Sequence, residues 1–265
     1  MSLPICVACG MQYAEPRPDC PICDDERQYV PPGGQQWTDL DTLRRQYRAR
    51  IEDQGPGVIG IGCEPKFAIG QRALLVRTGS GNFLWDCVAF LDDEVIAQIT
   101  ELGGISGIAI SHPHYYTTAI EWARAFDAPV YLHEHDEQWL GRPDEAVEWW
   151  NGRSKRVTPD LELINLGVHF TGGTVLYWPD GENGAGALLS GDIVQVIPDR
   201  KFVGFMYSYP NLIPERPPVV RRAAEILARY RFRAIYGAWW DAIVREDGYD
   251  VVQRSAKRYL DFVSS

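Results

Sequence analysis

Apolar and polar residues follow one another along most of the chain in the short periods that suit strands and amphipathic helices. Residues 38–53 (TDLDTLRRQYRARIED) have helical spacing, with Thr38 or Asp39 as a possible N-cap. After this segment the pattern changes to β-rich runs separated by turns. Strands are expected within 57–65, 67–88 (a hairpin around the turn TGSGN), 105–111, 128–136, 169–181, 186–196 and 232–239.

Helical periodicity recurs between and after these strands. The expected helices cover 91–104, 117–127, 217–231 and 249–263. A β–α–β–α–β order indicates a sheet with helices packed on it. Because a second β-rich series with its own helices follows the first, we expect an α/β protein. Its architecture should be a four-layer αββα sandwich, in the order helix, sheet, sheet, helix.

The first 36 residues have a different character. They are rich in Cys and Pro, and the polar connector DDERQYVPPGGQQW ends them. We therefore expect a small module over 1–36 and a larger domain over 37–265. The module has a C-x2-C-x10-C-x2-C pattern, in which two tight turns each place two sulfurs on one side of the backbone and together supply a tetrahedral shell. Its expected metal ligands are Cys6, Cys9, Cys20 and Cys23.

The metal in this module is less clearly specified than the site. Cys9-Gly10 followed by Tyr13, and then the sequence CPIC, resembles zinc-ribbon and rubredoxin-like knuckles alike. We favour zinc in a structural role, because a closed four-thiolate zinc site folds its module. Iron would make it an electron-transfer module instead. The module is expected to serve as a lid or as a surface for a protein partner or a second copy of the chain.

Composition excludes several classes of function. The chain has 265 residues, of which 45% are hydrophobic and 23% charged, as in ordinary globular proteins. Its formal net charge of −10 argues against nucleic acid as a partner. No apolar run approaches the roughly 18 residues of a membrane span, and the start lacks the pattern of a secretion signal. We expect a cytoplasmic protein without a membrane partner, in which clustered cysteines indicate metal rather than disulfides.

The second candidate site is a set of histidines. His112 and His114 lie in SHPHYYT, directly after an apolar strand, where side chains emerge at the carboxyl edge of a sheet. Alternate residues of an extended segment point the same way, so the two imidazoles can bind one ion. The pair alone fits two surface histidines equally well. Further along the chain, His169 precedes the turn and strand TGGTVLYW, and Asp192 ends the strand in LLSGDI.

This ordered set resembles the metallo-β-lactamase superfamily over residues from about 55 to 265. Chains of that superfamily carry H-x-H-x-D-H after a strand, then a histidine before a Gly/Ser/Thr turn, then Gly-Asp, on an αββα sandwich. The resemblance implies that His112, His114 and His169 are the ligands of the first metal position, with zinc or iron as the ion. It implies that Asp192 is the carboxylate that bridges two metals in binuclear members.

The chain departs from that pattern at the second metal position. Tyr116 stands in the place of the aspartate and Thr117 in the place of the following histidine. The segment AIYGAWWD puts Tyr236, Trp239 or Trp240 where the final histidine is expected. The resemblance therefore implies one metal ion at most in the ordinary position.

Two further histidines, His133 and His135, lie at the end of an expected strand in VYLHEHDEQW. They could bind a metal together with Glu134 or Asp136, or face solvent, and we favour the second interpretation because the superfamily pattern does not use this segment.

Two tyrosines follow the first histidine pair, Tyr115 and Tyr116. Packing explains both, but a phenol beside a zinc ion could donate to a developing oxyanion. Tyr116 is therefore kept with Asp192 as a candidate catalytic residue. Cys63 and Cys87 lie in apolar surroundings and are expected to be buried rather than nucleophilic.

The favoured function is a mononuclear zinc hydrolase. Zinc held by the three histidines would activate water, and Asp192 would bind or orient that water for attack on a small ester, thioester or lactone. One alternative is a non-catalytic binding or scaffolding protein of the same fold with a structural zinc knuckle. A redox protein with an iron knuckle is the least supported, because a carboxylate-rich di-iron ligand set is missing.

Overall fold

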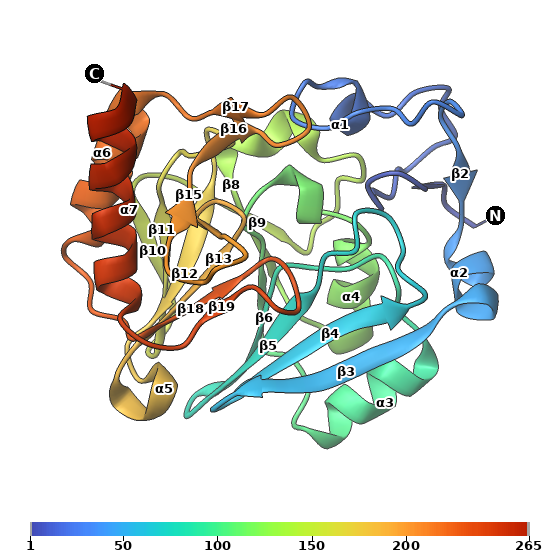
Figure 1. The fold of residues 1–265 in the computed structure, drawn as a ribbon. Coiled ribbons are helices and arrows are strands. Elements are labelled where there is room, and N and C mark those ends of the chain that lie inside the picture. The colour runs from blue at the N-terminus through green and yellow to red at the C-terminus, as the bar shows by residue number, and fades with distance from the viewer. Residues whose placement is uncertain (1, 264–265) are drawn as a thin grey trace.

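Two β-sheets pack face to face in the middle of the molecule, and helices cover the outer face of each sheet (Figure 1). The computed structural model describes residues 2–263. This arrangement confirms the four-layer αββα sandwich expected from the sequence. Among the residues described, no helix combines the length and the apolar character that a membrane crossing requires.

The first sheet has seven strands, antiparallel from β3 to β6 and parallel from β6 to β9. In spatial order they are β3 (Arg48–Gly55), β4 (Val58–Glu64), β5 (Ala73–Thr78), β6 (Gly81–Trp85), β7 (Ile108–Ala109), β8 (Val130–His133) and β9 (Val147–Trp150). Apolar side chains of two helices pack on its outer face. These helices are α3 (Asp93–Glu101) and α4 (Ala119–Phe126).

The second sheet has six strands, and only β13 and β18 are parallel neighbours. The strands are β10 (Ser154–Thr158), β11 (Leu161–Asn165), β12 (Thr174–Trp178), β13 (Ala187–Gly191), β18 (Ala234–Gly237) and β19 (Ile243–Val244). Its outer helices are α6 (Pro217–Leu227) and α7 (Gly248–Val263). Smaller elements are η1 (Pro113–Tyr115), η2 (Glu134–Trp139), α5 (Gly181–Gly184), β14 (Gln195–Val196), β15 (Val203–Gly204), β16 (Met206–Ser208) and β17 (Ile213–Pro214).

Three apolar layers separate the four structural layers. Along β5, Leu74 and Val76 belong to the core between the two sheets, whereas Ala73 and Leu75 belong to the core under α3 and α4. A strand buried on both faces needs a continuous apolar run, and ALLV supplies it. Burial on both sides fixes the sheets, so the loops at their edges are held by a rigid frame.

The topology brings several loops to one edge of this frame. Strands β4, β6 and β7 run in the same direction, so their ends at Glu64, Trp85 and Ala109 lie at the same edge of the first sheet. Asp86 follows the end of β6 directly, and His112 lies three residues after the end of β7. This is the carboxyl edge, where sites in α/β proteins are usually built.

The cysteine-rich module packs against this edge. Its strand β1 (Ile5–Cys6) pairs with β2 (Trp37–Thr38), and a short helix α1 (Pro21–Asp24) follows its third cysteine. Ile5 and all four cysteines share an apolar core with the first sheet. The backbone N–H of Gln12 donates to the carbonyl of Thr117 at 3.0 Å. The division at residue 36 stays a prediction, and β2 continues the module past that point.

The helix expected over 38–53 is shorter than predicted. Only α2 (Leu40–Gln46) is helical, with the Asp39 side chain as its N-cap, accepting from the backbone N–H of Thr42 at 2.7 Å. The following residues form β3, which pairs with β4 along its whole length. Hydrogen bonding to a neighbouring strand therefore overrides the helical spacing of RARIED, since helix propensity is a weak preference.

The contact between the module and α4 generates a stability prediction. Arg142 is buried, and its Nη1 lies 2.5 Å from Oε1 of Glu121 in α4 and also donates to the side-chain carbonyl of Gln12. Replacing Arg142 by methionine leaves both acceptors without this donor. We expect the free energy of unfolding in urea to fall by about 1–3 kcal/mol.

The matched control is Arg124→Met. The Arg124 guanidinium bonds to Asp144 at 2.7 Å, but its side chain is 59% exposed. Exposed pairs contribute little, so the expected loss is less than about 1 kcal/mol. Equal losses in the two variants would contradict an anchoring role for Arg142.

Candidate metal centre

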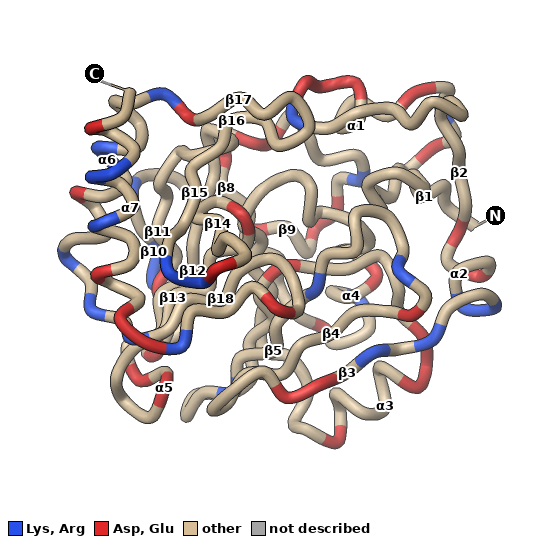
Figure 2. Tube along the Cα trace, viewed as in Figure 1, with Lys and Arg blue, Asp and Glu red and all other residues tan. Residues whose placement is uncertain are grey.

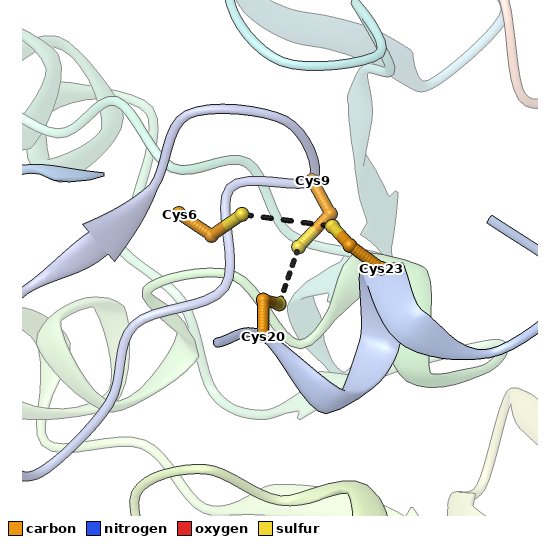
Figure 3. A group of neighbouring side chains, drawn as sticks. All are labelled: Cys6, Cys9, Cys20 and Cys23. Carbon is orange, nitrogen blue, oxygen red and sulfur yellow. Dashed lines mark hydrogen bonds between the residues drawn. The ribbon is translucent and has the colours of Figure 1, made fainter. Parts of the chain in front are cut away.

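The four cysteines of the N-terminal module surround one point (Figure 3). The Sγ atoms of Cys6 and Cys23 are 3.6 Å apart, as are those of Cys9 and Cys20. A tetrahedral ion with metal–sulfur bonds of about 2.3 Å places its sulfurs about 3.8 Å apart. All four are free thiols and all are buried. The donor set and spacing therefore fit a metal ion, as the sequence predicts.

Polar side chains support these sulfurs from outside. The Nε2 of Gln35 donates to Sγ of Cys6 at 3.2 Å, and the hydroxyl of Tyr13 lies 3.2 Å from Sγ of Cys20. Donors beside thiolate ligands stabilise their negative charge.

The three predicted histidines also come together. The ligand nitrogens of His112, His114 and His169 all lie within 4.8 Å of one another. The Nε2 of His169 is 3.4 Å from Nδ1 of His114. Two nitrogens bound tetrahedrally at about 2.0–2.1 Å are about 3.3–3.4 Å apart, so this spacing suits one ion between them. His112 precedes the single turn η1, which carries His114, whereas His169 comes from the turn before β12.

Hydrogen bonds orient two of the imidazoles. Nδ1 of His169 lies 2.8 Å from the carbonyl of Tyr207. A carbonyl only accepts, so Nδ1 carries the proton and the Nε2 lone pair is left for a metal. Nδ1 of His112 lies 2.9 Å from Oγ of Ser111, whose backbone N–H donates to Oδ1 of Asp86 at 2.7 Å.

Burial sets the charge of the histidines. Their exposed fractions are 1% for His112, 4% for His114 and 1% for His169. Desolvation lowers the pKa of all three, and that of His169 to about 4. At neutral pH they are uncharged and able to bind a metal.

Several polar atoms at this centre have no hydrogen-bond partner within residues 2–263. They are Nε2 of His112, Nε2 of His114, the hydroxyl of Tyr115 and Oδ1 of Asp192. Buried polar groups are almost always satisfied, so each such group needs an explanation. A cation between the imidazoles would coordinate the lone pair of Nε2 of His112 and attract the carboxylate oxygen of Asp192. His114 faces His169 through Nδ1, so its Nε2 would carry the ring proton and point away from that ion.

Asp192 lies beside His112 but is not a member of the three-histidine metal-ligand group, so its role as a metal ligand stays a prediction. Its Oδ1 is 3.3 Å from Nε2 of His112, and burial raises the pKa of its carboxyl to about 7. The residue before it must be glycine: a Cβ at Gly191 would lie 2.9 Å from Oγ of Ser111, and φ there is +52°. The hydroxyl of Tyr209 donates to the carbonyl of Asp192.

Asp86 is a part of this centre that sequence reasoning missed. Burial raises the pKa of its carboxyl to about 8, and the charge of Asp192 adds to this rise. Through Ser111 it helps to position His112. A signal was present, because Asp86 is the first residue after the apolar end of β6, at the sheet edge where Ser111 and His112 follow β7.

The second metal position has no comparable ligands. Within the described chain the histidine group has three members, and no second ion site adjoins it. The Tyr115 ring packs 5.3 Å from that of His112, whereas the charge acting on the buried Tyr116 phenol is that of Asp136. The hydroxyl of Thr117 lies 3.5 Å from the Tyr115 carbonyl. A catalytic role for Tyr116 stays a prediction.

The other histidine pair lies apart from this centre. The rings of His133 and His135 are 4.7 Å apart, and Nε2 of His133 lies 3.1 Å from the carbonyl of Gly152. Neither belongs to a metal-ligand group among the described residues. His135 is exposed, as expected, but the expectation that His133 faces solvent is wrong, because it is buried and packs 4.5 Å from the ring of Trp150. Burial raises the pKa of Cys63 to about 11 and of Cys87 to about 12, which does not suit nucleophiles.

The raised pKa of Asp192 generates a prediction about metal affinity. In the metal-free centre this carboxyl keeps its proton below about pH 7, and an incoming cation must displace that proton. The pKa of His169 is near 4, so its protonation competes only in more acid solution. With the cysteine site already loaded, we expect the affinity for a second equivalent of Zn²⁺ to fall up to about tenfold per pH unit below pH 7.

Chelator-competition titrations between pH 5.5 and 8.5 measure this dependence. Asp192→Asn should weaken binding at pH 8 and flatten the pH profile. An unchanged profile in that variant would show that another group carries the proton.

Comparisons with known proteins agree with this geometry. No family model matches the sequence. The Bacillus subtilis (strain 168) protein YmaE, described as uncharacterized, is 46% identical over 266 residues, which cover 98% of this chain and 97% of YmaE.

Solved metallo-β-lactamase structures share the fold. DIM-1 exposed to ceftazidime superposes with a TM-score of 0.60 at 16% identity, covering 80% of this chain and 98% of that chain. FIM-1 from Pseudomonas aeruginosa, in its mono-zinc form, gives a TM-score of 0.56 at 14% identity, covering 80% and 96%. By its sequence this chain belongs to the same family as YmaE, and by its structure it has the metallo-β-lactamase fold with an added four-cysteine module.

Proposed function

We propose that this protein is a metal-dependent hydrolase with one zinc ion at His112, His114 and His169, acting on a small ester, thioester or lactone. The observation that carries the proposal is the group of three buried, uncharged imidazoles whose ligand nitrogens all lie within 4.8 Å of one another. The carboxyl of Asp192 lies 3.3 Å from Nε2 of His112, and the described residues offer no ligand set for a second ion beside the histidines.

Zinc in such a three-histidine site supplies a bound water whose pKa is lowered toward about 7 and polarises a substrate carbonyl. Asp192 is placed to accept the proton that the attacking water loses, because its carboxyl oxygen lies 3.3 Å from Nε2 of the metal-ligand candidate His112.

Tyr115 is the better placed of the two tyrosines to stabilise an oxyanion. Its ring packs against His112, and its buried hydroxyl has no acceptor within residues 2–263. Burial raises the pKa of this phenol, so it stays a hydrogen-bond donor at neutral pH. A preorganised donor of this kind stabilises charge that develops in the transition state.

The cysteine module, in this proposal, holds a structural zinc and forms one wall of the centre. Nη1 of Arg27 donates to the carbonyl of His169 at 3.3 Å. The preceding residue, Glu26, accepts from the hydroxyl of Tyr207 and from Nδ2 of Asn211, each at 2.7 Å. The module thus lies against the β16–β17 hairpin at the top of Figure 1. Closed walls exclude water and strengthen electrostatic interactions.

A non-catalytic binding protein of the same fold is the second candidate. Two observations favour it: the missing ligands of the second metal position, and the exposed fractions of 1–4% at the histidines and Asp192. Under this reading the metal would be structural, and no substrate would reach it.

A hydrolysis assay separates the two candidates. We expect the protein loaded with two equivalents of zinc to hydrolyse members of a panel of small esters, thioesters and lactones. His114→Ala should lose the second zinc and at least about 10³-fold in kcat/KM, because the metal provides both nucleophile and electrophile. Tyr115→Phe should keep the zinc and lose about 10-fold to 100-fold, mainly in kcat.

The control for these variants is His135→Ala, which removes a histidine outside the metal-ligand groups. It should keep both zinc ions and full activity. Absence of turnover across the panel with both zinc ions bound would favour the binding protein, as would activity that survives His114→Ala.

The cysteine site should also affect the histidine site. Nε2 of Gln71 donates to the carbonyls of both Cys9 and His114, at 3.4 and 3.3 Å. Cys20→Ser should therefore lose the first zinc and weaken Zn²⁺ binding at the histidines at least about tenfold, a typical coupling between sites. Cys63→Ser, which changes a cysteine outside the cluster, should alter neither. Unchanged binding at the histidines in Cys20→Ser would mean that the two sites are independent.

A further inference from the structure

A cleft of about 520 Å³ lies at the same edge of the sandwich as the histidines. Its walls come from the start of β3, from the loop over residues 65–71 that follows β4, and from Trp240 in the loop after β18. This volume falls in the range of sites for small organic ligands. The cleft is separate from the cysteine and histidine clusters, none of whose residues line it.

One side chain connects the cleft to the metal centre. Gln71 lines the cleft, and its Nε2 donates to the carbonyl of His114 at 3.3 Å. The end of β4 and the end of β7 lie at the same sheet edge, so the cleft and the histidines are neighbours by topology as well. A ligand in the cleft would therefore contact Gln71, whose amide donates to the backbone carbonyl of the candidate metal ligand His114.

The charge of the cleft is opposite to that of the chain. Three cations, Arg48, Arg50 and Lys66, line it against one carboxylate, Glu64, although the whole chain carries a formal charge of −10. Glu64 pairs with Arg48 at 3.1 Å, and Glu52, beside the cleft on β3, pairs with Arg50 at 2.9 Å, which leaves Nη1 of Arg50 outside that pair. Lys66 makes no ion pair with any residue in 2–263. Basic residues at the start of β3 are visible in Figure 2. A concave surface of one sign concentrates ligands of the other sign.

The aromatic wall of the cleft is held in a fixed position. The Trp240 indole lies over two glycines of β4, where a Cβ at Gly60 or Gly62 would come within 2.9 or 2.8 Å of the ring. Arg50 pairs across the strands with Gly62, and its guanidinium lies 3.9 Å from the indole centre. The buried Arg72 donates to the carbonyl of Trp240 at 3.1 Å. Such a fixed stack of indole and guanidinium is a preorganised surface for a ligand.

We propose that this cleft binds the anionic part, a phosphate or a carboxylate group, of a small acyl substrate whose reactive carbonyl extends past Gln71 to the histidine centre. Lys66 and Arg50 contact the anion, and the indole of Trp240 packs against the chain that carries it. The proposal adds a substrate class to the hydrolase function and rests on that function for its acyl part. The anion site itself can be tested without turnover.

Calorimetric titration of the zinc-loaded protein tests the anion site. The probes are glycerol 2-phosphate and succinate, with glycerol as the uncharged comparison. We expect at least one anion to bind with a Kd in the micromolar to low millimolar range, and glycerol not to bind. Whichever of the two anions binds more tightly identifies the anionic group of the substrate as a phosphate or a carboxylate.

Variants locate the bound anion. Lys66→Glu and Arg50→Glu should each weaken binding at least tenfold. Lys155→Glu makes the same change of charge on β10, at the far edge of the other sheet, and should leave binding unchanged. His114→Ala should keep the anion, whereas its loss there would place the anion on the metal and overturn the proposal. Binding unaffected by Lys66→Glu, or no binding of either anion, would also overturn it.

Cys63 gives an independent readout because it lines the cleft and is a free thiol outside the cysteine cluster. Its alkylation by iodoacetamide at pH 9 should be slowed at least fivefold by a saturating anion. Equal rates with and without the anion would place the anion elsewhere.

Kinetics separate this proposal from the hydrolase function. If the protein hydrolyses esters, Lys66→Glu should raise KM for anionic esters at least tenfold more than KM for uncharged esters of the same acyl chain. Equal effects on both would overturn the cleft as a substrate site. If no ester is hydrolysed but anions bind through Lys66, the hydrolase function fails and the anion site stands.

Discussion

The constraint on which this structure depends is the burial of imidazole nitrogens and carboxyl oxygens at one edge of the first sheet. Three imidazoles and the carboxyl of Asp192 are almost fully withdrawn from water, and several of their atoms have no partner in residues 2–263. Each buried group without a partner costs about 1–3 kcal/mol. A frame of two sheets buried on both faces can hold such groups together, and a bound cation would offset part of that cost.

The cysteine module is built into this frame. Its cysteines lie in the same apolar core as the first sheet, and Gln71 joins the backbone of Cys9 to that of His114. Arg27 extends the connection to His169 and places its guanidinium 3.8 Å from the ring centre of Phe170, which packs on all three histidines. Metal binding at the cysteines is therefore expected to order one wall of the histidine centre.

The candidate metal ligands could be predicted from the sequence because metal-binding residues occur at characteristic short spacings. The two Cys-x-x-Cys turns and the ordered set of His112, His114, His169 and Asp192 lie where that spacing indicated. The error at β3 has another cause: RARIED has helical spacing, but it pairs with β4. Pairing of distant segments has no local signature.

The residues that sequence reasoning missed act through contacts between distant segments. Gln71 is an ordinary polar residue in a loop until the fold brings Cys9 and His114 to its amide. Trp240 packs flat because β4 has glycine at residues 60 and 62, 180 and 178 positions before it in the chain. The pattern of a single sequence shows the periodicity and the spacing of its residues. Contacts between distant segments change neither of them and cannot be predicted from them.

The fold also explains why one ion suits this centre better than two. Arg72 donates to the carbonyls of Gly237 and Trp240, in the segment where the superfamily places its last histidine. Burial lowers the pKa of this guanidinium only to about 10, so it is charged at neutral pH. A fixed cation in this segment would disfavour a second metal ion beside it, because repulsion between like charges is strong where water is excluded. Arg72 also holds Trp240, the aromatic wall of the proposed anion cleft, so we infer that the charge that would disfavour a second metal ion would also favour an anion in that cleft.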